Sequence, residues 1–268
     1  MLRSSLLNRM RLVSVKIDAA VTKRLLSRRR KVQSGEQELF TMRNYGYSAR
    51  MRSDTFERKE PEMLEWVKTW AAGSHFLDVG ASTGVYSLYA AAQGHQVIAL
   101  EPYALNFALL NLNISDNSFQ DSITVFPCSA NSQLAIANLN IAELEWGGGG
   151  STFEREQDWT GKSFAPDFRQ GSIGLSIDWL CQQCETYPNF IKVDVDGNEL
   201  MVLRGAQETL KRPDCLGVYI ELWQEHEEFD EACRILSDCG FVLGFVGGSD
   251  MFSQQKQYSR NYIFTKKL

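Results

Sequence analysis

The stretch "FLDVGASTGVYSLYAAAQG", residues 76–94, constrains the fold more than any other part of the chain. A short apolar run leads into a turn that contains Gly80 and Gly84, and the turn opens a helical pattern. Strand, tight turn and helix in this order form the first half of a βαβ unit, in which helices join parallel strands. The alternation continues downstream, so the sequence predicts an α/β fold.

Seven apolar or β-branched runs are long enough to be strands of one sheet, and helical patterns follow the first, second, fourth and fifth of them. These runs predict a Rossmann-like, mostly parallel sheet with helices on both faces. A sheet of this kind binds its ligand at the carboxyl ends of the strands, where the strand order reverses. The predicted strands are residues 75–79, 96–101, 123–127, 190–195, 218–222, 241–246 and 262–265.

The chain is expected to divide into an N-terminal helical extension, residues 1–60, and one α/β domain, residues 61–268. Apolar residues recur every three or four positions from Leu2 to Leu25, which is typical of an amphipathic helix. Its other face is basic. Such a helix could dock on the core or on a second subunit, lie on an anionic membrane, or serve as an organelle transit peptide.

Charge is spread unevenly along the 268 residues. Residues 1–31 hold ten lysines and arginines against Asp18, a net charge of +9, whereas the whole chain carries −5, so the remainder carries −14. An acidic body disfavours nucleic acid as a partner. No apolar run is long enough to span a bilayer, and no secretory signal is recognisable. With six sparse cysteines, these features predict a cytoplasmic protein whose Cys181–Cys184 pair packs in the interior.

An insertion, roughly residues 131–172, separates the third and fourth predicted strands. Four consecutive glycines, 147–150, favour mobility, while the aromatic residues around them are costly to leave in water. The insertion is therefore either a mobile lid that closes over a bound substrate or a surface loop whose aromatic side chains pack at its base.

The residues of the turn after the first predicted strand restrict the kind of ligand that can bind there. Gly80 and Gly84 lack the spacing of the GxGxxG dinucleotide fingerprint, which argues against a ligand that contains pyrophosphate. Glu101 ends the next strand, where its carboxylate can accept hydrogen bonds from both hydroxyls of a ribose. Asp78 can meet a cationic amino group. A nucleoside without phosphates that carries such a group is S-adenosylmethionine.

Two acids end the fourth predicted strand in "IKVDVDGNELMVLRGA". Asp194 and Asp196 are crowded carboxylates, an arrangement that usually serves a ligand, a cation or a shared proton. A transferred methyl group needs an acceptor oxygen that loses its proton, and the candidate bases are these two acids, Glu221 and His226. The acids could instead hold Mg²⁺, but no third ligand is clear, so metal use stays open.

Five segments, in order and at fitting spacing, resemble the FkbM family of S-adenosylmethionine-dependent methyltransferases: "FLDVGASTGVYSL", "VIALEPYALNFALLNLNI", "IKVDVDGNELMVLRGA", "GVYIELW" and "NYIFTKK". The resemblance covers about residues 74–268. It implies a class I methyltransferase fold whose last strand is antiparallel, and O-methylation of a hydroxyl, commonly on sugars or polyketide-type products.

Carried over to this chain, the resemblance makes Asp194 and Asp196 active-site residues. The family commonly has Asn where Ser82 stands and Glu where Asp196 stands. The expected cofactor contacts, with the neighbouring proline included, are Asp78, Gly80, Ala81, Ser82, Gly84, Glu101 and Pro102.

The expected function is therefore O-methylation of a small molecule or a glycan or natural-product precursor, with S-adenosylhomocysteine as the second product. Two alternatives remain: a non-catalytic scaffold that binds an adenosine-type ligand, and an NAD-dependent oxidoreductase. Acceptor specificity is expected to depend on the insertion and on residues 247–260.

Overall fold

The computed structural model describes residues 16, 22, 27–247 and 259–266. The N-terminal amphipathic helix predicted from Leu2 to Leu25 lies almost entirely outside the described residues. All seven predicted strands are present, within a few residues of the expected bounds, and form one sheet in the order β12-β13-β11-β10-β3-β4-β5. They are β3 (His75–Val79), β4 (Gln96–Leu100), β5 (Ile123–Phe126), β10 (Phe190–Val193), β11 (Gly217–Trp223), β12 (Phe241–Gly247) and β13 (Ser259–Lys266).

The sheet is mixed. Strands β5, β4, β3, β10 and β11 pair in parallel, whereas β13 runs antiparallel between β11 and β12. The chain builds outward from β3 through β4 to β5 and then returns to β10 on the other side of β3. The strand order therefore reverses between β3 and β10, which is where an open α/β sheet binds its ligand.

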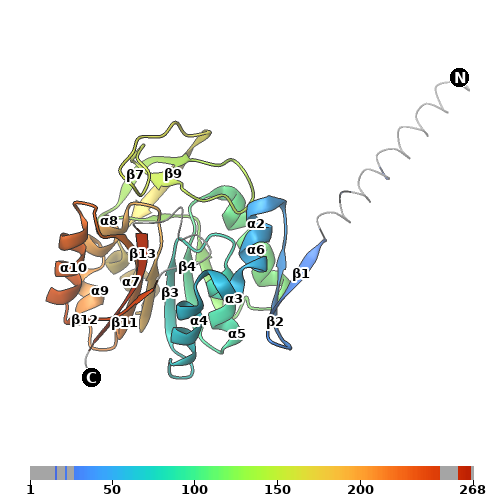
Figure 1. Cartoon of the computed structure of the whole chain (residues 1–268), viewed down its shortest axis with the longest axis horizontal. Coiled ribbons are helices and arrows are strands. Elements are labelled where there is room, and N and C mark those ends of the chain that lie inside the picture. The colour runs from blue at the N-terminus through green and yellow to red at the C-terminus, as the bar shows by residue number, and fades with distance from the viewer. Residues whose placement is uncertain (1–15, 17–21, 23–26, 248–258, 267–268) are drawn as a thin grey trace, which may run out of the picture.

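Helices cover both faces of the sheet, which makes a three-layer structure (Figure 1). One buried apolar cluster joins the sheet to α7 (Ile177–Cys184), α8 (Glu199–Arg204), α9 (Gln207–Lys211) and α10 (Phe229–Asp238). A second cluster joins the opposite face to α4 (Pro61–Lys68), α5 (Val85–Ala92) and α6 (Ala104–Asp116). Strand β10 is buried along its whole length, so it lies at the centre of the core.

The N-terminal extension is not entirely helical, contrary to the prediction. Residues 29–43 form an antiparallel hairpin, β1 (Arg29–Ser34) and β2 (Gln37–Arg43), followed by α2 (Gly46–Asp54) and α3 (Phe56–Lys59). Along β2, buried Phe40 and Met42 alternate with more exposed residues, the two-residue period of a strand with one buried face. The hairpin packs its apolar side into the second cluster.

Two asparagines bind the backbone of β2, one on α6 and one at the C-cap of that helix. The amide of Asn117 accepts a hydrogen bond from the N–H of Thr41 at 2.7 Å and donates one to its carbonyl oxygen at 2.8 Å. One turn earlier, Asn113 accepts a hydrogen bond from the N–H of Arg43 at 2.8 Å and donates one to the carbonyl oxygen of Thr83 at 2.9 Å. These side chains provide hydrogen-bond partners for backbone groups of β2 that would otherwise need a further neighbouring strand.

The predicted insertion contains a second sheet. Residues 129–175 contribute four strands in the order β6-β9-β7-β8, namely β6 (Ser129–Ala130), β7 (Ala135–Ile141), β8 (Thr152–Phe153) and β9 (Phe168–Leu175). Strands β7 and β9 lie at one end of the molecule, beyond the main sheet (Figure 1). The sequence predicted a mobile lid or a surface loop here and gave no sign of these strands.

We expect Asn113→Ala to lower the free energy of unfolding by about 2–4 kcal/mol, because it leaves two buried backbone groups without their partners. Asn113 is fully buried. The midpoint of urea unfolding measures the change, provided that the denaturant slope is constant. The exposed Asn111→Ala on the same helix is the control. Equal midpoints for the two variants would show that the hairpin does not depend on this tether.

Candidate active site

The turn after β3 is shaped by two close approaches. Gly80 and Gly84 have left-handed φ values of 81° and 88°. A Cβ at Gly80 would collide with the carbonyl oxygen of Asp194, and one at Gly84 would collide with the side chain of Leu110. The backbone oxygen cannot give way, so glycine is required at Gly80 for steric as well as conformational reasons, whereas the end of the Leu110 side chain can move and Gly84 is favoured chiefly by its left-handed φ. Between them, Ser82 has φ of 52°, an uncommon conformation for a residue with a side chain.

Glu101 lies at the end of β4 and binds the turn. Its carboxylate accepts hydrogen bonds from the backbone N–H of Ser82 at 2.6 Å and of Tyr103 at 2.8 Å. Burial raises the pKa of Glu101 to about 7, although these two hydrogen bonds and the positive charge of Arg52 oppose the shift. The sequence-predicted residues Glu101 and Ser82 are thus in direct contact.

Asp194 is held by a buried lysine that the sequence reading did not single out. Lys192 lies within β10, with a side chain 2% exposed, and its Nζ is 2.9 Å from Oδ2 of Asp194, whose side chain is 20% exposed. Burial alone would lower the pKa of Lys192, but the carboxylates of Asp194, Asp78 and Glu60 outweigh it and raise that pKa.

Asp78 lies beneath the turn and is not part of the pocket wall. One of its oxygens accepts a hydrogen bond from the hydroxyl of Ser87 at 2.5 Å, and the residue is 1% exposed. Burial raises the pKa of Asp78, while Lys192 and Ser87 act in the opposite direction. The structure therefore gives Asp78 contacts that support the turn.

The glycine run lies against the acids after β10. The N–H of Gly150 donates to Oδ2 of Asp196 at 2.8 Å, and Asp196 has a left-handed φ of 56°. Asn106 on α6 donates to the carbonyl oxygen of Gly148 at 3.0 Å and accepts from the N–H of Gly147 at 2.9 Å. The run is therefore fixed across the site by side chains from two other segments.

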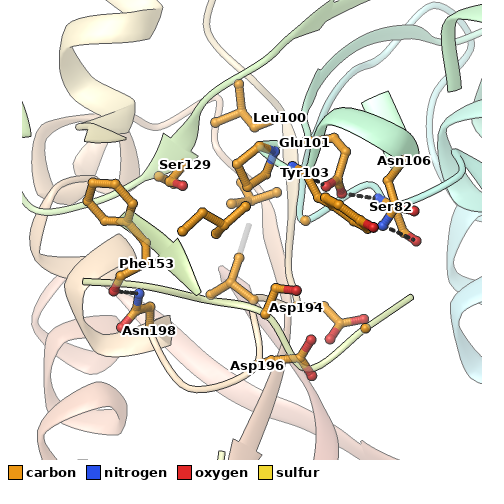
Figure 2. A pocket seen from close by; sticks show the side chains of 18 of the residues that line it. Ser82, Leu100, Glu101, Tyr103, Asn106, Ser129, Phe153, Asp194, Asp196 and Asn198 are labelled. Atoms are coloured by element: carbon orange, nitrogen blue, oxygen red, sulfur yellow. Dashed lines mark hydrogen bonds between the residues drawn. The ribbon is translucent and has the colours of Figure 1, made fainter. Parts of the chain in front are cut away.

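These elements enclose a pocket of about 190 Å³ at the point where the strand order reverses (Figure 2). The figure shows Glu101 and Tyr103 on one side of it and Asp194 and Asp196 on another. Of the residues predicted from the sequence, those that line the pocket are Gly80, Ser82, Glu101, Pro102, Asp194, Asp196 and Glu221. Lining residues that the sequence reading did not single out include Arg52, Lys59, Asn106 and Asn198.

A second, smaller hollow adjoins the pocket and shares Asp196 and Glu221 with it. His226 lines this hollow together with Asp196 and Glu221, but it does not line the pocket that holds Asp194. Trp159 of the insertion and Trp223 meet edge-on there, with ring centres 6.0 Å apart.

Glu199, which the sequence reading also passed over, completes the acidic side of this hollow. Its carboxylate accepts hydrogen bonds from the N–H groups of Val195 and Gly197 at 3.1–3.2 Å. Burial, with a contribution from the nearby Glu221, raises the pKa of Glu199 to about 8. The sequence signal that could have pointed to Glu199 is its position: an acid in the first turn of a helix that follows directly on the strand-end acids.

Within the described residues, no group of three or more His, Cys, Asp or Glu side chains could hold a metal ion. Cys181 is buried and its thiol is free, and burial raises the pKa of that thiol to about 11. In the same part of the chain, no helix is long and apolar enough to cross a membrane.

The sheet order and the glycine turn with an acid after the next strand are those of the class I methyltransferase fold. Fibrillarin from Aeropyrum pernix, solved with natively bound S-adenosyl-L-methionine, aligns with a TM-score of 0.50 and 11% identity over 88% of each chain. The FkbM methyltransferase from Methylobacillus flagellatus KT aligns with a TM-score of 0.51 and 18% identity. That alignment covers 78% of this chain and 49% of the other, so this chain spans about half the length of that protein.

A sequence model of the methyltransferase FkbM domain matches residues 78–243, more than half of the chain. The chain belongs to the FkbM methyltransferase family, as its motifs predicted. No curated protein matches it in sequence.

The raised pKa of Glu199 gives stability a pH dependence. The folded protein keeps this proton up to about pH 8, whereas the unfolded chain releases it near pH 4.5. The stabilisation that this proton supplies is therefore complete below about pH 4.5, falls as the pH rises from there, and is gone above about pH 8. From pH 5 to 8, wild-type stability should fall relative to Glu199→Gln by up to about 1.4 kcal/mol per pH unit.

Urea unfolding of both proteins across this range tests the prediction, with the exposed Glu208→Gln as the matched control. Parallel pH profiles for wild type and Glu199→Gln would contradict it.

Proposed function

We propose that the chain transfers a methyl group from S-adenosylmethionine to a hydroxyl of a small molecule or of a glycan or natural-product precursor. The observation that carries the proposal is the pocket itself, in which Glu101 after β4 faces Asp194 and Asp196 after β10, with β3 between the two strands. Family membership supports methyl transfer, and the two acids after β10 suit an acceptor whose proton must be removed.

The residues present suit this cofactor. Glu101 offers a carboxylate for the two ribose hydroxyls, and the absence of phosphate from the ligand agrees with a turn that departs from GxGxxG. Gly80, Ser82 and Pro102 line the same wall, while Gly84 and Asp78 support it from behind. Ala81 lines a small extension of the pocket. When bound, the cofactor supplies an electrophilic methyl carbon, and the protein supplies alignment of the acceptor.

Asp196 is our choice for the base that takes the acceptor's proton. Its backbone is held in an uncommon conformation and its carboxylate is fixed by Gly150, a combination that is frequent at active sites. Asp194 is already paired with Lys192, so we assign it to holding a ligand group in place and not to removing the proton. Glu221 lies where the pocket and the second hollow meet, and is therefore placed to orient the acceptor. His226 is assigned no step.

Cofactor binding is tested first by thermal unfolding with S-adenosylhomocysteine and, separately, with NAD. A ligand at about 100 times its dissociation constant should stabilise the protein by roughly 2.7 kcal/mol. We expect a shift with S-adenosylhomocysteine alone, and its loss in Glu101→Ala. A shift with NAD alone would favour an oxidoreductase instead.

Methyl transfer is tested with methyl-labelled S-adenosylmethionine and a small-molecule extract. We expect label in a product that resists alkaline hydrolysis, as a methyl ether does and a methyl ester does not. Asp196→Asn should reduce transfer roughly 10²- to 10⁴-fold and leave the affinity for S-adenosylhomocysteine within about threefold. Binding of S-adenosylhomocysteine without any transfer by the wild type would favour the non-catalytic scaffold.

A further inference from the structure

The pocket continues past the glycine turn into a narrow extension that carries both signs of charge. Five residues line both the pocket and this extension, so the two spaces are continuous: Arg52, Lys59, Gly80, Ser82 and Asp194. Glu101 lies in the pocket but not in the extension. A ligand whose ribose is bound by Glu101 would therefore reach the extension with the part of the molecule beyond the ribose.

Two of the cations that line the extension come from the N-terminal segment, outside the residues that match the FkbM domain. Arg52 lies on α2 and Lys59 ends α3. Arg52 donates from Nε and Nη2 to the carbonyl oxygen of Gly147, both at 3.2 Å, and a guanidinium has five N–H donors in all. Lys59 forms an ion pair with buried Glu60 at 2.7 Å. Both side chains are thus oriented by contacts with their neighbours.

The negative side is Asp194, held in place by Lys192 from within β10. Lys192 also lines the extension, which thus presents three cations and one carboxylate, with Lys192 and Asp194 paired to each other. A free α-amino acid group offers a carboxylate to Arg52 and Lys59 and an ammonium to Asp194, both attached to one carbon. Helix α5 begins at Val85, which also lines the extension, and a helix N-terminus favours a negative group in the same place.

We propose that Arg52, assisted by Lys59, binds the carboxylate of the cofactor's methionine moiety, and that Asp194 receives its amino group. This rests on the proposed use of S-adenosylmethionine. It assigns a cofactor-binding role to the N-terminal segment and moves the ammonium contact from Asp78, which lies beneath the turn, to an acid on the pocket wall.

Two ligands that differ by a single carboxylate test the proposal. S-Adenosylhomocysteine carries it, and S-adenosyl-3-thiopropylamine has lost it but keeps the adenosine and the amino group. Dissociation constants for both are measured by calorimetry with wild type, Arg52→Gln, Lys59→Gln and Arg50→Gln. Arg50 lies on the same helix, is exposed and pairs with Asp54, so it is the matched control.

We expect Arg52→Gln to weaken S-adenosylhomocysteine binding roughly tenfold to a hundredfold, as the loss of a hydrogen bond to a charged group does. Lys59→Gln should weaken it less. Binding of S-adenosyl-3-thiopropylamine should stay within about twofold in every variant, which also shows that each variant is folded.

Two results would overturn the proposal. One is an unchanged affinity for S-adenosylhomocysteine in Arg52→Gln. The other is an equal loss of affinity for both ligands, which would show that Arg52 acts only through its contact with Gly147. Failure of the wild type to bind either ligand would instead overturn the proposed function, so the two failures are distinguishable.

Discussion

The close approach of Gly80 to the carbonyl oxygen of Asp194 is the constraint on which the site depends. Strands β3 and β10 are parallel neighbours whose carboxyl ends lie side by side, and any side chain at Gly80 would occupy the space of that oxygen. Because the two chain segments touch there, the turn after β3 and the acids after β10 line one pocket. The function that we propose needs a cofactor-binding turn close to an acid that faces the acceptor, and this single contact brings the two segments together.

Charge inside that junction is balanced by residues from separate parts of the chain. Lys192 faces Asp194 directly, and its raised pKa also reflects Asp78 on β3 and Glu60 at the start of α4. An isolated buried lysine would be costly, so these carboxylates are what allow a cation in the middle of the sheet. The N-terminal segment is therefore part of the electrostatics of the site, even though it lies outside the residues that match the family domain.

The main sheet could be predicted from the sequence because its strands are largely buried, so each reads as a short apolar run between turns. Gly80 and Glu101 could be placed in the pocket wall from the sequence, because each stands at the end of a predicted strand. The hairpin at residues 29–43 could not be found in this way, since the partners of its backbone are side chains on a distant helix. The place of Asp78 beneath the turn, and of His226 in the adjoining hollow, likewise depends on packing that no local pattern records.

The glycine run shows how composition alone misleads. Four glycines suggest mobility, but a Cβ at Gly147 would collide with the backbone of Ala49, and one at Gly148 with the carbonyl oxygen of Glu143. Here glycine permits close packing, and the run is then bound through Asn106, Arg52 and Asp196. Contacts from α2, α6 and the loop after β10 thus converge on one short segment across the pocket. Arg52 and Asp196 both bind this segment, so displacement of either side chain would remove one of the contacts that hold the segment in place.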